Sequence, residues 1–166
     1  MQEVLIFSDS HGKADAMCRT IEAHPSATHI LFCGDGLRDV ALLAEQYPKR
    51  VFHAVSGNCD LFASLDGATY EKLVFLGGLR VLLMHGHLYG VKGGYGAAAA
   101  HAYRSGAEIL VFGHTHIPYE GRYEVDEGSV HLFNPGSIGR MYSGVYSYGV
   151  LTIGEDGYLF SHGTTI

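Results

Sequence analysis

The feature that most constrains the fold of this chain is a series of short apolar runs that alternate with helix-like segments. Val4–Phe7, His29–Cys33 and Val51–Val55 are three such runs, and continuous apolar runs are typical of β-strands covered on both faces. Between them, Lys13–His24 carries apolar residues at roughly helical spacing and Asp39–Tyr47 is a second predicted helix, each ending at a proline. This β-α-β-α-β order predicts parallel strands joined by right-handed crossovers.

The second half of the chain has a different pattern. Tyr70–Leu76 and Arg80–Met84 flank a Gly-Gly pair and predict a hairpin, followed by an alanine-rich helix at Gly96–Ser105 and a buried strand at Glu108–Phe112. Four more strand-like segments, separated by turn residues, are expected to form an antiparallel run: Tyr119–Val125, Val130–Phe133, Tyr146–Ile153 and Tyr158–His162.

These elements predict one α/β domain over residues 1–166 (α+β by some schemes). The expected architecture is a four-layer α-β-β-α sandwich, in which two mixed β-sheets pack face to face with helices outside. A chain of 166 residues is large enough for a single hydrophobic core. The strand-rich tail taken alone would also fit other α+β arrangements.

Charge and cysteine content limit the classes of partner. A formal net charge of -6 argues against extended nucleic acid as a partner. The three cysteines form no C-x-x-C pair, which favours a reducing cytoplasm. No apolar run reaches the roughly 18 residues of a membrane helix, and the first strand, Glu3–Ser8, runs directly into Asp9, so no cleavable signal peptide is expected. We therefore expect a soluble cytoplasmic protein with no membrane partner.

Five polar motifs follow the apolar runs, and together they hold seven side chains that can bind metal: Asp9, His11, Asp35, Asn58, His85, His114 and His116. Ligands of open α/β sheets bind beyond the carboxyl ends of the strands, so these residues should share one rim. Within Asp9/His11 and His114/His116, the two-residue spacing lets both side chains point the same way if the backbone is extended. The flanking glycines allow the sharp turns that such a site needs.

The chemistry of these side chains indicates metal-assisted hydrolysis. Taken singly, each motif has an ordinary interpretation, such as a turn, a strand-end cap or an exposed loop. Five together at strand ends are difficult to explain in that way. Carboxylate, imidazole and amide ligands suit manganese, iron, zinc, nickel or cobalt better than calcium or magnesium.

On these residues the chain resembles the calcineurin-like metallophosphoesterases, whose blocks read D-x-H, G-D, G-N-x-D/E, G/M-H-G-H and G-H-x-H. The resemblance spans Asp9 to His116, and Asn134–Ser137 matches a further turn of that family. Within the family, the short length and the Gly-Asn-Cys-Asp block are most similar to the small prokaryotic YfcE-type phosphodiesterases. The resemblance implies hydrolysis of a small soluble phosphodiester by attack of a metal-bridging hydroxide.

The resemblance also implies two divalent cations, with manganese the first choice and nickel, zinc, iron or cobalt as alternatives. One cation would be held by Asp9, His11, Asp35 and His116. The other would share Asp35 and add Asn58, His85 and His114. An aspartate can bridge two cations because its oxygens carry several lone pairs and a full negative charge.

One departure from the wider family concerns the leaving group. Many of its phosphatases carry a histidine after the asparagine, whereas this chain has Cys59, and a thiol is a poorer general acid near neutral pH. This predicts a preference for phosphodiesters with acidic leaving groups. The predicted catalytic residues are Asp35, Asn58, Cys59 and His87, where His87 is either a proton donor or a supporting residue.

Two further residues, Asp60 and Arg140, are candidates for roles near the metal ligands. Asp60 is expected to orient a metal-binding histidine. Arg140 either grips a phosphate oxygen or forms an ordinary surface ion pair.

Other functions remain open on the same site. They are a phosphomonoesterase, a nuclease and a non-catalytic scaffold module. Substrate choice is expected to depend on rim loops at Leu37-Arg38, Leu61–Thr69 and Tyr89–Tyr95. Tyr142, Tyr146 and Tyr148 belong either to the core or to an oligomer interface, so a homodimer or a homotetramer stays an open prediction.

Overall fold

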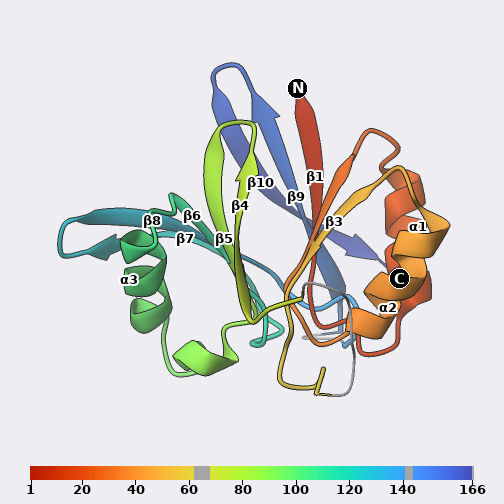
Figure 1. Ribbon diagram of the computed structural model, residues 1–166, viewed down its shortest axis with the longest axis horizontal. Helices are drawn as coiled ribbons and strands as arrows, with labels where there is room; N and C mark the ends of the chain where they lie inside the picture. The colour runs from red at the N-terminus through yellow and green to blue at the C-terminus, as the bar shows by residue number, and fades with distance from the viewer. Residues whose placement is uncertain (62–67, 141–143, 166) are drawn as a thin grey trace.

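The structure, a computed structural model, describes residues 1–61, 68–140 and 144–165. Its first half has the predicted β-α-β-α-β order: β1 (Gln2–Phe7), α1 (Ala14–Ala23), β2 (His29–Phe32), α2 (Leu37–Gln46) and β3 (Val51–Ala54). β1 pairs with β2 in parallel, and β2 pairs with β3 in parallel. The helical crossovers lie together on one face of this sheet (Figure 1).

The second sheet begins with the predicted hairpin, β4 (Glu71–Leu76) and β5 (Leu79–Met84). A short 3₁₀ helix, η1 (His87–Tyr89), and the helix α3 (Gly96–Arg104) follow. The chain then returns as β6 (Ile109–Val111), which lies parallel to β5. The strand order of this sheet is β4-β5-β6-β8-β7.

The last four strands do not form the single antiparallel run expected from the sequence. β7 (Pro118–Val125) and β8 (Gly128–Pro135) form one antiparallel hairpin, and β9 (Tyr146–Gly154) and β10 (Gly157–Thr165) form another. β8 joins β6 in parallel, whereas β9 pairs with β1 in the other sheet, whose order is β10-β9-β1-β2-β3. Local turn signals predict each hairpin but not the sheet to which it belongs, because that depends on distant strands.

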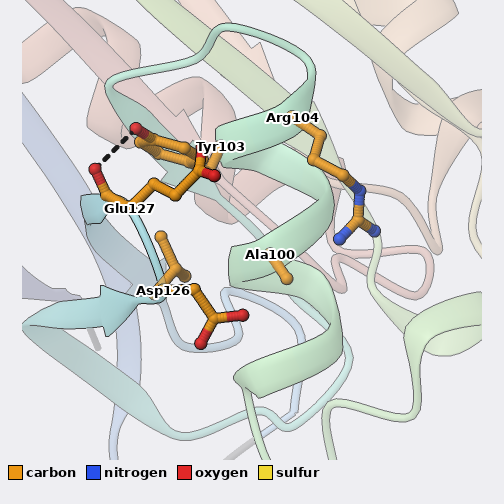
Figure 2. Close-up of a pocket in the computed structure, with 6 residues that line it drawn as sticks. Ala100, Tyr103, Arg104, Asp126 and Glu127 are labelled. Atoms are coloured by element: carbon orange, nitrogen blue, oxygen red, sulfur yellow. Dashed lines mark hydrogen bonds between the residues drawn. The ribbon is translucent and has the colours of Figure 1, made fainter.

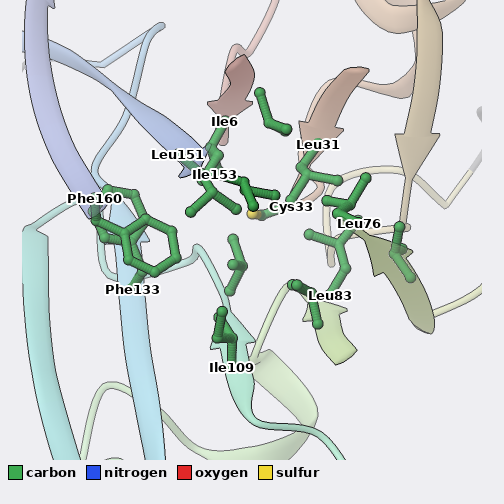
Figure 3. Packing of buried hydrophobic residues seen from close by; sticks show 14 of the residues in the cluster. Ile6, Leu31, Cys33, Leu76, Leu83, Ile109, Phe133, Leu151, Ile153 and Phe160 are labelled. Atoms are coloured by element: carbon green, nitrogen blue, oxygen red, sulfur yellow. The ribbon is translucent and has the colours of Figure 1, made fainter. Parts of the chain in front are cut away.

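The two sheets pack face to face around a core of aliphatic and aromatic side chains. Ile6 and Leu31 from the first sheet face Leu83 and Ile109 from the second (Figure 3). The helices α1 and α2 cover the outer face of the first sheet through a separate cluster, and α3 covers the outer face of the second. The four-layer α-β-β-α sandwich is therefore confirmed.

Two further observations concern the surface. Tyr148 packs against the rings of Phe7 and His24, at centroid distances of 6.2 and 5.6 Å, which assigns it to packing. Tyr142 lies outside the described residues. Among the helices in the described ranges, none combines the length and apolar character needed to span a membrane.

Candidate metal centre

The predicted ligand residues meet at one rim, where the carboxyl ends of strands from both sheets face each other. Asp9, Asp35 and Asn58 come after β1, β2 and β3. On the opposite sheet, His85 directly follows β5 and His114 follows β6. Among the described residues, three groups of three side chains lie close enough together to hold an ion: Asp9, His11 and His116; Asp9, Asp35 and His85; and His11, Asp35 and Cys59.

Each aspartate has one oxygen fixed by the protein and the other directed at histidines. Asp9 Oδ2 accepts hydrogen bonds from the Ser8 hydroxyl and from the backbone N–H of His114, while Oδ1 lies 3.1 Å from His116 Nε2. Asp35 Oδ1 accepts from the backbone N–H of Cys59 at 2.7 Å. The fixed oxygens orient the carboxylates and leave the second oxygens for a cation.

The free oxygen of Asp35 lies between the two predicted groups of ligands. Its Oδ2 is 3.9 Å from His11 Nε2, which belongs to the first group, and 3.5 Å from His85 Nε2, which belongs to the second. His85 Nε2 is also 3.2 Å from both Asn58 Oδ1 and His114 Nδ1. This position suits the bridging role predicted for Asp35.

His85 is held in the orientation that exposes its Nε2 atom to the cluster. Its ring is fully buried, and Nδ1 lies 2.7 Å from the Cys33 carbonyl oxygen. A carbonyl can only accept, so Nδ1 carries the hydrogen of this bond and Nε2 is left facing the cluster. Such a hydrogen bond to the far nitrogen is the usual support of a metal-binding histidine. Burial disfavours the charged ring, but Asp35 and Asp9 outweigh it and raise the pKa of His85, so a cation would take the place of a proton on Nε2.

His11 provides a direct test of fit for a cation. Its Nε2 atom is buried and has no hydrogen-bond partner within the described part of the chain. The nearest carboxylate oxygens, Asp9 Oδ1 and Asp35 Oδ2, are 3.8 and 3.9 Å away. Buried polar atoms are almost always satisfied, and a cation with ligands at about 2.0–2.2 Å would satisfy all three atoms. The donor set therefore fits a divalent metal.

The protonation states of the cluster also suit a cation. Burial alone would raise the pKa of Asp35, but hydrogen bonding and charge from His85 outweigh it and lower the pKa. Burial and the neighbouring His85 lower the pKa of His114 to about 4. An ionised carboxylate and a neutral imidazole are the forms in which these groups bind metal.

The ligand loops have left-handed backbone conformations. Asp9, His11, Asp35, His114 and His116 have φ between 45° and 67°, and no other non-glycine residue of the described ranges has positive φ. The condition of an extended backbone, on which the two-residue spacing argument depended, is therefore not met, because each motif turns sharply out of its strand instead of continuing it. Residues held in this region cost roughly 1–3 kcal/mol each and concentrate at functional sites.

Two buried carboxylates outside the ligand set hold these strained loops. Asp60 accepts four backbone N–H groups from the loops around Asp35 and Gly57. The expectation that Asp60 orients a histidine was therefore wrong. Asp39 accepts from the Ser10 hydroxyl and from the N–H of Gly12. Sequence reasoning missed Asp39 because an aspartate in the first turn of a helix is ordinary.

The Asn-Pro-Gly-Ser turn connects the strands' ends across the rim. Asn134 Nδ2 donates to the Gly113 carbonyl at 3.0 Å, and Ser137 Oγ donates to the Asp9 carbonyl at 2.9 Å. The turn therefore fixes the backbone on both sides of the predicted first cation.

Cys59 and His87 border the cluster without belonging to its buried centre. Cys59 is an exposed residue whose thiol is only partly removed from water. This partial desolvation and the Asp35 carboxylate together raise the pKa of the thiol. The His87 ring lies 5.3 Å from the His85 ring and 5.8 Å from the Tyr70 ring, and its Nδ1 is buried with no partner in the described ranges. Burial and the charge of His85 lower the pKa of His87.

A cavity of about 430 Å³ opens beside the cluster, lined by His11, Asp35, Cys59 and Arg38 among others. A larger cavity of about 630 Å³ lies between α3 and the β7–β8 turn (Figure 2), but none of the predicted ligands lines it. The smaller cavity is therefore the candidate substrate site. Residues 62–67 of the predicted rim loop lie outside the described residues.

The charge of Arg140 reaches this cavity. Next to burial, the charge of Arg140 is the largest influence that lowers the pKa of His11, and the same charge acts to lower the pKa of Cys59. Within the described ranges, the Arg140 guanidinium forms none of the ion pairs that the surface interpretation requires. This leaves Arg140 available to a phosphate oxygen.

Comparison with known proteins gives consistent matches over most of the chain. It is 32% identical to "Probable metallophosphoesterase YsnB" of Bacillus subtilis over 92% of this chain and 85% of that protein. It is 31% identical to "Phosphodiesterase YfcE" of Escherichia coli strain K12 over 91% of this chain and 88% of that protein.

The fold is shared with a solved structure of Vps29 from Entamoeba histolytica complexed with zinc. The TM-score is 0.69 at 21% identity, over 98% of this chain and 99% of that one.

Residues 2–156 match the calcineurin-like phosphoesterase superfamily domain. The chain therefore belongs to the calcineurin-like phosphoesterase superfamily.

Proposed function

We propose that the protein is a metal-dependent phosphodiesterase that hydrolyses a small soluble phosphodiester. The observation that carries the proposal is the geometry of Asp9 and Asp35, each with one oxygen fixed and one free oxygen directed at imidazole nitrogens. Family membership and the relative named as a phosphodiesterase support the reaction class.

The metal ligands are proposed as they were predicted. Asp9, His11, Asp35 and His116 would hold one divalent cation, while Asp35, Asn58, His85 and His114 would hold the other. Manganese is the first choice, because nitrogen and oxygen ligands suit it, with nickel, zinc, iron and cobalt as alternatives. Two such cations, when bound, activate water for attack on phosphorus and neutralise phosphate oxygens.

The residues around the cations would bind the phosphate and donate a proton to the leaving group. Arg140 would pair with a phosphate oxygen, since its charge reaches His11 and Cys59. His87 would supply a proton to the leaving oxygen, which its position beside the rings of His85 and His114 supports. Proton donation is limited near neutral pH because the pKa of Cys59 is raised and the pKa of His87 is lowered, so diesters with acidic leaving groups are the favoured substrates.

A metal-by-substrate screen tests this proposal. The metal-free protein would be loaded with each cation and assayed on bis(p-nitrophenyl) phosphate, a phosphoserine peptide and a single-stranded oligonucleotide. We expect the aryl diester to be cleaved best, and Asp35→Asn to lose at least a hundredfold in kcat/KM. Asp156→Asn, in the exposed β9–β10 turn, is the matched control.

The screen also separates the alternatives. Faster cleavage of the peptide would favour a phosphomonoesterase, and faster cleavage of the oligonucleotide a nuclease. Metal binding without any hydrolysis would favour a scaffold module. Full activity of Asp35→Asn would contradict the bridging role.

Location and assembly are further proposals. We propose a cytoplasmic location, which the three free cysteines support. A homodimer or a homotetramer remains a prediction that sedimentation would decide.

A further inference from the structure

The candidate substrate cavity extends well beyond the predicted metal ligands. It begins at His11 and Asp35 and reaches the first turn of α2, where Arg38 lines its wall. Its volume of about 430 Å³ falls within the roughly 300–1,000 Å³ typical of sites for small organic ligands. A scissile phosphate group at the ligands would leave the part beside Arg38 for one of the ester arms.

Arg38 brings a cation to this part of the cavity. Its side chain is exposed, and within residues 1–61, 68–140 and 144–165 it forms no ion pair. By contrast, Arg80 pairs with Glu108 at 3.6 Å. An arginine on the wall of a substrate cavity with no carboxylate to pair with is placed to bind an anion.

Two acidic residues that line the same cavity, Asp39 and Asp60, already accept hydrogen bonds from the protein. Asp39 accepts from the Ser10 hydroxyl and the N–H of Gly12, and Asp60 accepts four backbone N–H groups. Both carboxylates are buried. They support the loops and do not neutralise the Arg38 guanidinium by a direct contact.

The scissile phosphate has to lie against the metal ligands, two of which, His11 and Asp35, line this cavity. Arg38 lines the same cavity from the first turn of α2, beyond the loop that holds Asp35. The cavity has room for an organic ligand and not only for a phosphate group. The anion that pairs with Arg38 is then a second group, farther along the substrate.

Resting on the proposed function, we propose that Arg38 forms a second anion subsite and determines specificity. The substrate is then a phosphodiester with one ester arm that ends in a carboxylate or a phosphate. A guanidinium pairs with either group through two parallel hydrogen bonds.

Matched substrates test the subsite. Three p-nitrophenyl phosphodiesters would share the same leaving group and differ only in the second arm, which ends in a carboxamide, a carboxylate or a phosphate. We expect kcat/KM of the manganese-loaded protein to be about fivefold higher for at least one anionic arm than for the carboxamide. The better of the two anionic arms identifies the group. In Arg38→Gln the ratio should fall to about one, and in the control Arg104→Gln, an exposed arginine on α3 (Figure 2), it should stay unchanged.

Calorimetry gives a readout that does not depend on turnover. 2-Carboxyethylphosphonate, 2-phosphonoethylphosphonate and the carboxamide analogue would be titrated into the manganese-loaded wild type and Arg38→Gln. Tighter binding of an anionic analogue by the wild type alone supports the subsite. Equal dissociation constants in the wild type, or an equal weakening of all analogues in Arg38→Gln, would overturn it. If anionic preference persists in calorimetry while no diester is hydrolysed with any metal, the subsite stands and the proposed function fails.

Discussion

Replacing Asp60 with asparagine should destabilise the protein strongly, although the two side chains have nearly the same shape. Asp60 Oδ2 accepts from the N–H groups of Asp35 and Gly57, both at 2.8 Å, and Oδ1 accepts from Gly36 at 2.9 Å and Leu37 at 3.0 Å. The carboxylate thus joins the loop after β2 and the first residue of α2 to the loop after β3. Asp60 is 8% exposed, so water replaces few of these bonds.

The magnitude follows from the pairing of donors on each oxygen. An asparagine keeps one accepting oxygen, and its amide nitrogen cannot accept, so either orientation of the amide loses two of the four bonds. A hydrogen bond to a charged group contributes about 1.5–3 kcal/mol to stability. The loss of two bonds at the lower end of this range predicts a decrease of about 3 kcal/mol in the free energy of unfolding.

Urea denaturation measures this decrease, with far-UV circular dichroism as the signal of unfolding. EDTA in the buffer removes the contribution of bound metal. The control is Asp156→Asn, at an exposed turn position, for which we expect a change within about 0.5 kcal/mol. A decrease of less than about 1 kcal/mol for Asp60→Asn would refute the reasoning, because it would mean that the four bonds contribute little to the folded state.

Three further predictions test other parts of the structure. Gly57→Ala should abolish tight manganese binding, measured by calorimetry, because the added Cβ would lie 2.1 Å from Asp35 Oδ1 and 2.6 Å from the Asp35 backbone nitrogen. Manganese at about 100 times its dissociation constant should raise the unfolding free energy of the wild type by about 2.7 kcal/mol, and His85→Gln should lose most of this increase. Burial, aided by Lys72, lowers the pKa of His53 to about 4, below the roughly 6.5 of an unfolded histidine. Between these two pKa values the unfolded chain binds a proton at His53 that the folded protein does not. The free energy of unfolding should therefore fall by about 1–2 kcal/mol as the pH is lowered from about 6.5 to about 4, after a discount for the partial exposure of His53. His53→Gln should lack this part of the pH dependence, which urea denaturation of both proteins across this pH range would measure.

The position of the site could be predicted from the sequence because its signals are local. Strands such as Val4–Phe7 are apolar throughout, and a polar, glycine-flanked motif marks the point where each one ends. The carboxyl ends of parallel strands meet at one edge, so the convergence of Asp9 and Asp35 required no knowledge of side-chain positions. His114 follows a strand of the other sheet, and its approach to them also requires the two sheets to pack face to face. The same locality explains why the helix and strand boundaries agree closely with the structure.

The parts that were wrong depend on contacts between segments far apart in the chain. The turn at Glu155–Gly157 predicts a β9–β10 hairpin, but only its register with β1 places that hairpin in the first sheet. The role of Asp39 depends on the loop that contains Ser10 and Gly12, which lies 27 residues earlier. Neither partner carries a sequence signal that points to the other.

The left-handed ligand residues explain why such supports are needed, and they add a second measurement to the Asp60→Asn experiment. Five strained residues at roughly 1–3 kcal/mol each would relax unless surrounding bonds hold them. Asp60 holds Asp35, whose free oxygen faces His11 on one side and His85 on the other. If the fold arranges the ligands before the cation binds, Asp60→Asn should weaken manganese binding at least tenfold under conditions where the variant is still folded. An unchanged dissociation constant together with reduced stability would mean that the cation itself assembles the site, and that the strain is imposed by the metal rather than by the fold.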